Sequence, residues 1–358
     1  MLHALIMAGG GGTRFWPRSR QQKPKQFLSL TGDRTLLQQA FDRIEATISP
    51  QCMWVITSAA YSDQVSQQLP LPSHRIIGEP FGRDTAACIG LGACLMADAD
   101  PDAIMLVMPA DHIIEPAQQF QRAIRAAEQI TIDRPSALVT FGISPTYPAT
   151  GYGYIQRGGH LATRQGIDVF HVNAFREKPK PELAQQFLAE GGYFWNSGIF
   201  LWKVDAILQA LQSCRPELYA AVRRIADAWK TPERDETFRR EYQRLERISI
   251  DYAVMENARN VLVVEAPFQW DDVGSWLAVE RLHPQDADDN TVLALHAGQN
   301  TKRCIIVADE GHLIATAGVQ DLLIVQDGNV TLIADRRDES AVKELVQRLR
   351  EMGLEDYL

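Results

Sequence analysis

Short apolar runs alternate with segments of helical spacing from residue 3 to residue 142, and this alternation constrains the fold more than any other feature of the sequence. The apolar runs lie at residues 3–8, 53–57, 75–78, 103–108 and 137–142. Strands that are apolar throughout are typical of a parallel sheet covered by helices on both faces. The sequence therefore predicts an α/β fold with a Rossmann-like, mostly parallel sheet.

Near residue 285 the pattern changes to short β-rich runs separated by Gly, Asp and Asn turns. These runs fit either a meander or a small β-solenoid, since periodicity alone does not choose between them. They lie at residues 291–295, 304–308, 312–316, 321–326 and 329–334. An amphipathic helix follows, with Val342, Leu345, Val346 and Leu349 on one face. We expect a large domain over residues 1–285 and a small β-rich tail domain with a terminal helix over residues 286–358.

Composition excludes several classes of protein. The net charge of −9 argues against a nucleic-acid partner. No apolar run approaches the roughly 20 residues that cross a bilayer, and the first residues do not resemble a signal peptide. We therefore expect a cytoplasmic protein with no membrane partner. The five cysteines form no C-x-x-C pair and the eight histidines show no H-E-x-x-H spacing, which argues against disulfides and zinc sites.

A glycine-rich turn follows the first apolar run, in the sequence A-G-G-G-G-T-R at residues 8–14. Glycines here allow the backbone to approach a ligand closely and to turn its N–H groups toward anionic oxygens. The turn lacks the Lys-Ser/Thr of a Walker A loop and the third glycine of a dinucleotide fingerprint. Residues 14–25 add five cations and no acid, namely Arg14, Arg18, Arg20, Lys23 and Lys25. Alone this stretch would be a solvated basic loop; beside the glycine turn it predicts a cradle for a triphosphate.

Asp111 follows the apolar run at 103–108 within the sequence P-A-D-H at 109–112. In open α/β sheets the ligand crevice lies at the carboxyl ends of the strands, which predicts Asp111 on the same edge as the glycine turn. An aspartate at this position could also cap the next helix. Beside a phosphate cradle we favour a Mg²⁺ ligand, because carboxylate oxygens are hard donors that bridge protein and metal.

At this point the sequence resembles the mannose-1-phosphate guanylyltransferases, also called GDP-mannose pyrophosphorylases, within the sugar-phosphate nucleotidyltransferase family. The resemblance begins with G-G-G-G-T-R-F-W-P-R-S-R-Q-Q-K-P-K-Q-F at residues 9–27. It continues through E-P-F-G-R-D-T-A-A at 79–87, P-A-D-H at 109–112, G-Y-G-Y-I at 151–155, F-R-E-K-P at 175–179, F-W-N-S-G-I-F at 194–200 and W-D-D-V-G-S-W at 270–276. The chain departs from the family at Asp84, where Asn is common, and at Ala87, where Pro is common.

The resemblance implies a role for each matching residue. Arg14 would bind the β- and γ-phosphates, Lys25 would lie near the α-phosphate, and Lys178 would hold the sugar phosphate. The nucleotide would lie on Ala8, on the loop from Gly9 through Gly10 and Gly12 to Thr13, and on Glu79, Pro80, Asp84 and Thr85. The sugar hydroxyls would be held by Gly153, Glu177 and Asn196, and Mg²⁺ by Asp111 and Asp272.

Simpler interpretations of the later motifs remain open at this stage. Glu177-Lys178-Pro179 could be a surface turn, and Trp270 and Trp276 are expected to be wall and core residues. The amide of Asn196 needs partners if it is buried, and either a backbone group or a sugar hydroxyl would serve. Asp271 competes with Asp272 for the metal, and the family pattern favours Asp272, which directly precedes Val-Gly.

The function implied is transfer of GMP from GTP to α-D-mannose 1-phosphate, giving GDP-mannose and pyrophosphate by Mg-assisted in-line attack on the α-phosphorus. No general base is needed, because a phosphate monoester loses its second proton with a pKa near roughly 6. Alternatives are a nucleotidyltransferase for another sugar 1-phosphate or nucleotide, a non-catalytic nucleotide-sugar sensor, and a bifunctional isomerase, which the end of the chain at Leu358 disfavours. The tail is similar to the short β-helix region of the family, which implies a homodimer.

Overall fold

The computed structural model of the chain describes residues 1–10, 12–338 and 340–358. These residues form two compact units, each built from separate stretches of the chain. The first unit comprises Met1–Gly9, Ala40–Ala110 and Ile114–Trp270, and the second comprises Gly10–Gln39, Asp111–Ile113 and Asp271–Leu358. One residue of the predicted phosphate loop, Gly11, lies outside the described residues.

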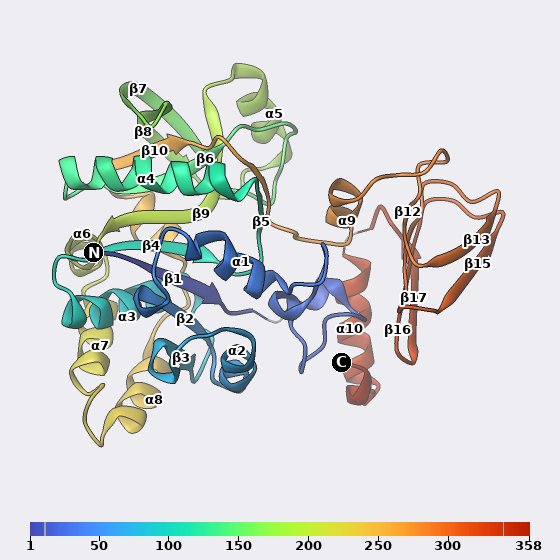
Figure 1. The fold of residues 1–358 in the computed structure, drawn as a ribbon, viewed down its shortest axis with the longest axis horizontal. Coiled ribbons are helices and arrows are strands. Elements are labelled where there is room, and N and C mark those ends of the chain that lie inside the picture. Colours follow the sequence, from blue (N-terminus) through green and yellow to red (C-terminus); the bar gives the residue numbers. More distant parts are fainter. Residues whose placement is uncertain (11, 339) are drawn as a thin grey trace. The chain divides into compact units, whose positions relative to one another are not determined.

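The described residues of the first unit form a nine-stranded sheet (Figure 1). In spatial order the strands are β3 (Ile76–Glu79), β2 (Met53–Ser58), β1 (Leu2–Ala8), β4 (Ile104–Pro109), β9 (Tyr193–Lys203), β6 (Leu138–Ile143), β10 (Val261–Glu265), β8 (Ile167–Arg176) and β7 (Tyr154–Arg164). β1 pairs in parallel with β2 and β4, and β6 pairs in parallel with β10. β9 runs antiparallel to both β4 and β6, so the sheet is mixed. The predicted α/β class is confirmed, with an antiparallel part that the apolar pattern did not reveal.

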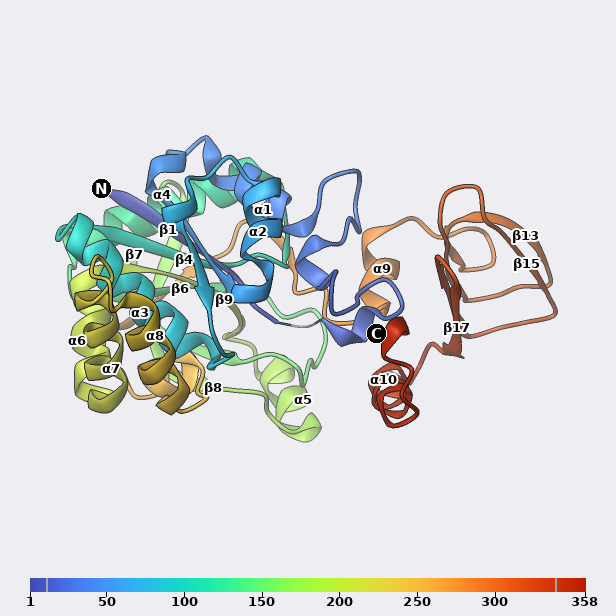
Figure 2. The ribbon, with the colours of Figure 1, turned by 90° about the horizontal axis from the view of Figure 1, so that it is seen from below.

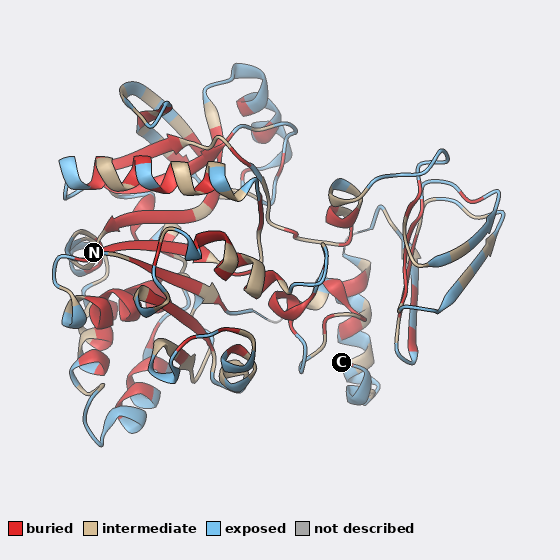
Figure 3. Ribbon diagram, viewed as in Figure 1, coloured by how far each residue is buried: buried red, intermediate tan, exposed pale blue. Residues whose placement is uncertain are grey.

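Helices cover both faces of this sheet. α3 (Asp84–Ala99), α6 (Val204–Cys214) and α7 (Pro216–Asp227) pack on one face, and α4 (Ala117–Asp133) lies on the other (Figures 1 and 2). Figure 3 shows buried and exposed residues alternating along α4, as expected for a helix with one apolar side. Further helices before β10 are α1 (Leu36–Glu45), α2 (Ser62–Gln68), α5 (Pro181–Glu190) and α8 (Arg234–Arg244).

The C-terminal part of the second unit is a short β-solenoid. β12 (Thr291–Leu293), β14 (Ile305–Val307) and β16 (Leu322–Asp327) pair in parallel, and β17 (Val330–Asp335) closes this sheet antiparallel to β16. β13 (Leu295–Gln299) and β15 (Leu313–Ala317) pair in parallel and lie side by side in Figure 2. Because these strands pair in parallel, the β-rich runs form a solenoid and not a meander. β13 was not predicted, because its residues are mostly exposed and lack an apolar run.

The second unit also contains α9 (Leu277–Leu282) and the terminal helix α10 (Ala341–Glu351). Val342 and Val346 of α10 are buried in one core with Phe15 and Trp276. Gly353 follows α10 with a φ of 72°, a conformation that favours glycine at the end of a helix. The expected amphipathic helix is therefore present.

The compact units are not divided at residue 285, where the sequence texture changes. Residues 10–39 belong with residues 271–358, because Phe15, Trp16 and Leu28 share a core with the solenoid strands and α10. Among the described residues, no helix combines the length and the apolar character that crossing a membrane requires.

Gly142 in β6 provides a test of packing in the first unit. A Cβ on Gly142 would lie 2.7 Å from Cβ and Cγ of Phe194 and 2.7 Å from Cγ2 of Val263. Because overpacking a core is destabilising, we expect Gly142→Ala to lower the free energy of unfolding by about 1–3 kcal/mol in urea denaturation. Gly159→Ala is the matched control, since nothing lies within 4 Å of its Cβ position. Equal stability of the two variants would contradict this packing.

Candidate functional site

The shape of the glycine loop depends on Gly12. Its φ is 54°, in the left-handed region that favours glycine. A Cβ on Gly12 would collide with the Lys25 side chain and lie 2.8 Å from the Lys25 backbone nitrogen. The Gly12 carbonyl accepts hydrogen bonds from the Phe15 backbone nitrogen (3.1 Å) and the Ser19 hydroxyl (2.5 Å). The loop therefore lies directly against Lys25.

Lys25 connects three distant stretches of the second unit. It opens the short 3₁₀ turn Lys25–Phe27, and its side chain is only 10% exposed. Its Nζ donates to Asp111 Oδ2 at 2.7 Å and to the Asp272 backbone oxygen at 2.6 Å. A nearly buried ammonium requires such partners, because burial without them is costly. The predicted residues Lys25, Asp111 and Asp272 are thus brought together.

Asp111 is held in its anionic form. Burial by itself would raise the pKa of Asp111, but the charges of Lys25 and His112 and the hydrogen bond from Lys25 outweigh burial and lower it. The residues after Asp111 form the strand β5 (Ile113–Glu115) and not a helix, so Asp111 is not a helix cap. An ionised carboxylate at this position can bind a cation.

The two neighbouring aspartates, Asp271 and Asp272, have different surroundings. Asp271 accepts the Val273 backbone N–H at 2.7 Å and binds Arg281 through both oxygens, at 2.6 and 3.0 Å. Asp272 lines a hollow together with Lys25 and Asp111. Val273, which follows Asp272, has a φ of 49°, a strained conformation for a β-branched residue. Asp271 thus fixes the turn that presents Asp272.

The hollow has a volume of about 340 Å³ and lies within the second unit. Arg14 is exposed and donates to the Gly274 carbonyl at 3.4 Å. The hollow is lined by Gly12, Thr13, Arg14, Phe15, Lys25, Asp111, His112, Asp272, Gly274 and Lys343. Lys343 belongs to α10 and could not be predicted from the sequence, because a lysine on the polar side of an amphipathic helix carries no signal.

The five cations of residues 14–25 do not all reach the hollow. Arg18 donates to the Ala308 carbonyl at 2.7 Å, and Arg20 binds the backbone oxygen and a carboxylate oxygen of Asp327, both at 3.1 Å. Both arginines therefore anchor the loop segment to the solenoid. Lys23 is exposed and does not line the hollow. The prediction of a five-cation cradle is wrong in this respect, because backbone and carboxylate acceptors of the solenoid bind Arg18 and Arg20.

The hollow fits a magnesium ion. Magnesium is bound in proteins through one or two carboxylates, with waters and substrate phosphates completing its octahedral shell. Asp111 and Asp272 supply two carboxylates, and no group of three or more His, Cys, Asp or Glu side chains able to hold a metal occurs among the described residues. Two carboxylates without further protein ligands suit an ion whose remaining ligands are water and phosphate oxygens.

Glu79 lies at the end of β3 in the first unit, beside the end of β1. A Cβ on Gly9 would lie 3.9 Å from Glu79 Oε2, and the fully buried Tyr242 of α8 donates a hydrogen bond to Glu79 Oε1. Burial raises the pKa of Glu79 to about 7; the Tyr242 bond opposes this rise and the charge of Asp84 adds to it. Glu79 was predicted from the sequence, but its partner Tyr242 was not, because Tyr242 lies 163 positions further along the chain.

The other residues predicted to surround the base have structural roles here. Asp84 has a φ of 64°, and its Oδ1 accepts the Thr85 backbone N–H at 2.8 Å. The Thr85 hydroxyl accepts the backbone N–H of Ile250 at 2.9 Å. Pro80 is partly exposed between Glu79 and the start of α3. Thr85 therefore ties α3 to the segment around Ile250.

Gly153, Glu177 and Asn196 form a second cluster in the first unit. A Cβ on Gly153 would collide with Glu177 Oε2 and lie 3.3 Å from Cβ of Asn196. Lys178 is exposed and donates to Glu177 Oε1 at 2.7 Å, while the Glu177 side chain is only 9% exposed. The sequence Glu177-Lys178-Pro179 is therefore more than a surface turn.

Asp251 joins this cluster and was missed in the sequence. The amide of Asn196 donates to Asp251 Oδ1 at 2.9 Å, and its oxygen accepts from the Thr140 hydroxyl and the Gly198 backbone N–H. Burial, followed by the charge of Glu177, raises the pKa of Asp251 to about 7. Asp251 opens a single π-helical turn, Asp251–Met255, a feature frequent at functional sites. The π turn is invisible to a search for helical or strand periodicity.

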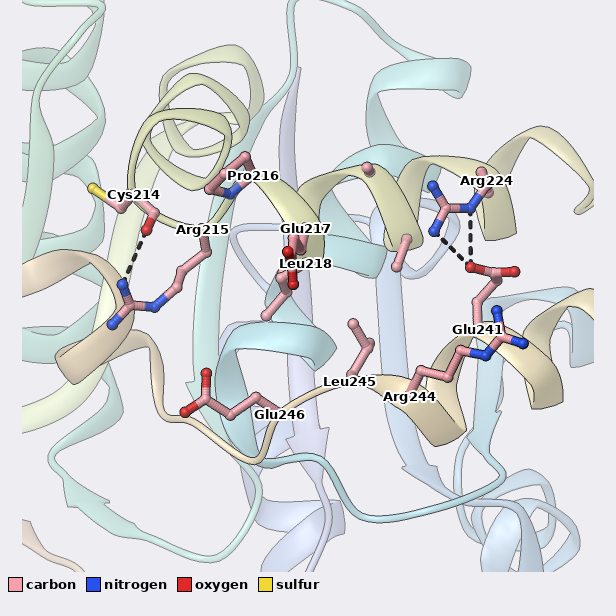
Figure 4. A pocket seen from close by; sticks show the side chains of 12 residues that line it. Cys214, Arg215, Pro216, Glu217, Leu218, Arg224, Glu241, Arg244, Leu245 and Glu246 are labelled. Carbon is pink, nitrogen blue, oxygen red and sulfur yellow. Dashed lines mark hydrogen bonds and ion pairs between the residues drawn. The ribbon is translucent and has the colours of Figure 1, made fainter.

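A larger cavity of about 520 Å³ lies elsewhere in the first unit, along α7 and the segment that follows α8 (Figure 4). Figure 4 shows Leu218 and Leu245 at its centre and Arg224 bound to Glu241, at 2.6 Å. Arginines and glutamates line it in equal number, so their charges balance. None of the predicted site residues lines this cavity, and we do not assign the chemistry to it.

Comparison with known proteins shows the family of the chain. Residues 3–289 match the family model described as Nucleotidyl transferase, and residues 296–349 match the MannoseP isomerase/GMP-like beta-helix domain. A mannose-1-phosphate guanylyltransferase of Escherichia coli strain K12 is 37% identical over 365 residues, which cover 99% of this chain and 75% of that protein. A putative mannose-1-phosphate guanylyltransferase of Vibrio cholerae serotype O1 is 37% identical over 366 residues, covering 100% of this chain and 76% of the relative.

A crystal structure named as a mannose-1-phosphate geranyltransferase from Thermus thermophilus superposes with a TM-score of 0.87 at 32% identity, covering 98% of this chain and 99% of that one. The family-model matches together span most of the sequence, and the relatives align with nearly all of it. The chain belongs to the nucleotidyl transferase family, in the group of the mannose-1-phosphate guanylyltransferases.

Proposed function

We propose that the chain transfers GMP from GTP to α-D-mannose 1-phosphate, releasing pyrophosphate and forming GDP-mannose. The observation that carries the proposal is the hollow in which Lys25, Asp111 and Asp272 meet beside the glycine loop. The names of the relatives support GTP and mannose 1-phosphate as the substrates. The proposal includes Mg²⁺ as the metal, a homodimer as the assembly and the cytoplasm as the location.

The reaction requires two anions to be brought together and the charge of the leaving pyrophosphate to be stabilised. Arg14 and Lys25 bind the triphosphate, Lys178 binds the sugar phosphate, and Asp111 and Asp272 hold the metal. When bound, Mg²⁺ neutralises charge on the phosphate oxygens. The sugar phosphate is already largely a dianion at neutral pH, with a second pKa near roughly 6, so no residue has to remove a proton.

Asp111 and the phosphates compete for Lys25 in this proposal. The ammonium of Lys25 lies 2.7 Å from Asp111 and neutralises its charge. Asp111 would hold the metal, whose charge would compensate the carboxylate, and Lys25 would then be able to bind phosphate oxygen. Substrate binding would therefore separate Lys25 from Asp111.

Glu79 is suited to select guanine. A carboxylate accepts hydrogen bonds only, and guanine offers adjacent N–H donors at N1 and N2 whereas adenine does not. Tyr242 fixes one carboxylate oxygen of Glu79 and favours the ionised form. The sugar ring is assigned to Gly153, Glu177 and Asn196, with Asp251 orienting the Asn196 amide.

The proposal is tested by assaying pyrophosphate release with GTP, ATP, UTP and dTTP, each paired with mannose 1-phosphate and with glucose 1-phosphate. We expect the highest kcat/KM for GTP with mannose 1-phosphate. A preference for another nucleotide or sugar would support one of the alternative transferases. Binding of the nucleotide without turnover of any pair would support a nucleotide-sugar sensor instead.

Lys25→Ala is expected to lower kcat/KM by about 10²–10³, because it removes one well-placed electrostatic contact to the phosphates. Lys23→Ala is the matched control: it removes the same charge two positions away, from an exposed side chain. The control should retain wild-type activity. Steady-state assays measure kcat/KM for both variants. Near wild-type turnover by Lys25→Ala would show that the role assigned to Lys25 is wrong.

The raised pKa of Glu79 predicts that kcat/KM for GTP depends on pH. Its pKa is raised to about 7, so the accepting carboxylate is present above that pH and is lost as pH falls through it. Tyr242→Phe removes a bond that lowers this pKa, and we expect the midpoint of kcat/KM for GTP to move to higher pH. The profile for mannose 1-phosphate serves as control and should not move. An unchanged GTP midpoint in Tyr242→Phe would contradict the assignment.

A further inference from the structure

The hollow contains a cation that no sequence motif marks, Lys343 of α10. The helix packs against the 3₁₀ turn Thr13–Phe15, and Val342 and Val346 share a core with Phe15. Apolar packing on the residue adjacent to Lys343 therefore sets its position relative to the loop. The Trp16 indole N–H donates to the Tyr357 backbone oxygen at 2.7 Å and anchors the end of the chain to the same segment.

Lys343 differs from the other cations of this region in its partners. Arg18 and Arg20 are bound to solenoid oxygens, and Lys25 is bound to Asp111 and Asp272. The ammonium of Lys343 makes no hydrogen bond or ion pair with any residue of the described ranges. Its side chain is exposed at the hollow, and four flexible methylenes allow the charge to reach a ligand.

Lys343 changes the net charge of the side chains that line the hollow. Arg14 and Lys25 contribute two positive charges, and Asp111 and Asp272 contribute two negative charges. Without Lys343 these four groups cancel, and a polyphosphate would meet no net positive charge from them. Among the side chains that line the hollow, Lys343 adds one further positive charge, which attracts a polyanion. Because Arg18 and Arg20 are turned away, this charge comes from the terminal helix.

We propose that Lys343 binds the phosphate groups of the nucleotide and of the released pyrophosphate, so that the terminal helix contributes directly to substrate binding. This inference rests on the proposed function and names a further binding residue of that site. The tail then has a role beyond packing. The solenoid and α10 hold the loop in place through Arg18, Arg20 and Phe15, and Lys343 of α10 binds phosphate.

The test compares Lys343→Met with Arg350→Met, which removes the same charge from the same helix at an exposed position that does not line the hollow. We expect Lys343→Met to raise the KM for GTP, and the KM for pyrophosphate in the reverse reaction, by about tenfold, as for the loss of one hydrogen bond to a charged group. The KM for mannose 1-phosphate should not change. Arg350→Met should behave as wild type, and Lys343→Arg should restore most of the loss.

Calorimetric titration of Mg²⁺-pyrophosphate into each variant gives a readout that does not depend on turnover. The expected result is the same tenfold loss of affinity, about 1.4 kcal/mol, in Lys343→Met only. Wild-type affinity in Lys343→Met, or an equal loss in Arg350→Met, would overturn the inference. Thermal unfolding of the variants checks that they are folded, and Lys343→Gln replaces Lys343→Met if the latter is destabilised. A wild-type protein that binds pyrophosphate but turns over no pair of substrates would contradict the proposed function and leave this comparison intact.

Discussion

The second unit is organised around the contact of Lys25 with Asp111 and the Asp272 backbone. Three stretches of chain, around residues 25, 111 and 272, are joined by a single ammonium at 2.7 and 2.6 Å. Gly12 must lack a side chain for the loop to lie against this lysine, and the strained Val273 turn must hold Asp272 in place. The pairing of the two carboxylate-bearing stretches depends on this arrangement, because loss of Lys25 would leave Asp111 without its compensating charge.

The solenoid and the terminal helix provide the support for that contact. Phe15 and Trp276 pack at a centroid distance of 5.1 Å, and the Trp276 indole N–H donates to the Trp16 carbonyl at 3.2 Å. Arg18 and Arg20 bind solenoid oxygens. A basic loop of this kind would be mobile if it were only solvated; here apolar packing and hydrogen bonds fix its backbone. The tail thus belongs to the same compact unit as the glycine loop, and under our proposal it also binds phosphate.

The sequence predicted the features that depend on local pattern. The apolar runs of β1 and β4 and the amphipathic α10 follow from periodicity. Resemblance placed Lys25, Asp111 and Asp272 in one site. It could not show that Arg18 and Arg20 serve the solenoid, because their partners Ala308 and Asp327 are separated from them by 290 and 307 positions. The same reason explains why the sequence did not reveal Tyr242, Asp251 and Lys343. Each residue type is common in a helix or turn, and only contacts with distant residues indicate a role in the site.

A crystal structure of the protein with GTP and Mg²⁺ tests the central claim most directly. The account predicts the triphosphate in the hollow lined by Gly12, Thr13 and Arg14, the metal on Asp111 and Asp272, and the Lys25 ammonium on phosphate oxygen. GTP bound at another place, with the Lys25–Asp111 ion pair intact and no phosphate in the hollow, would contradict it.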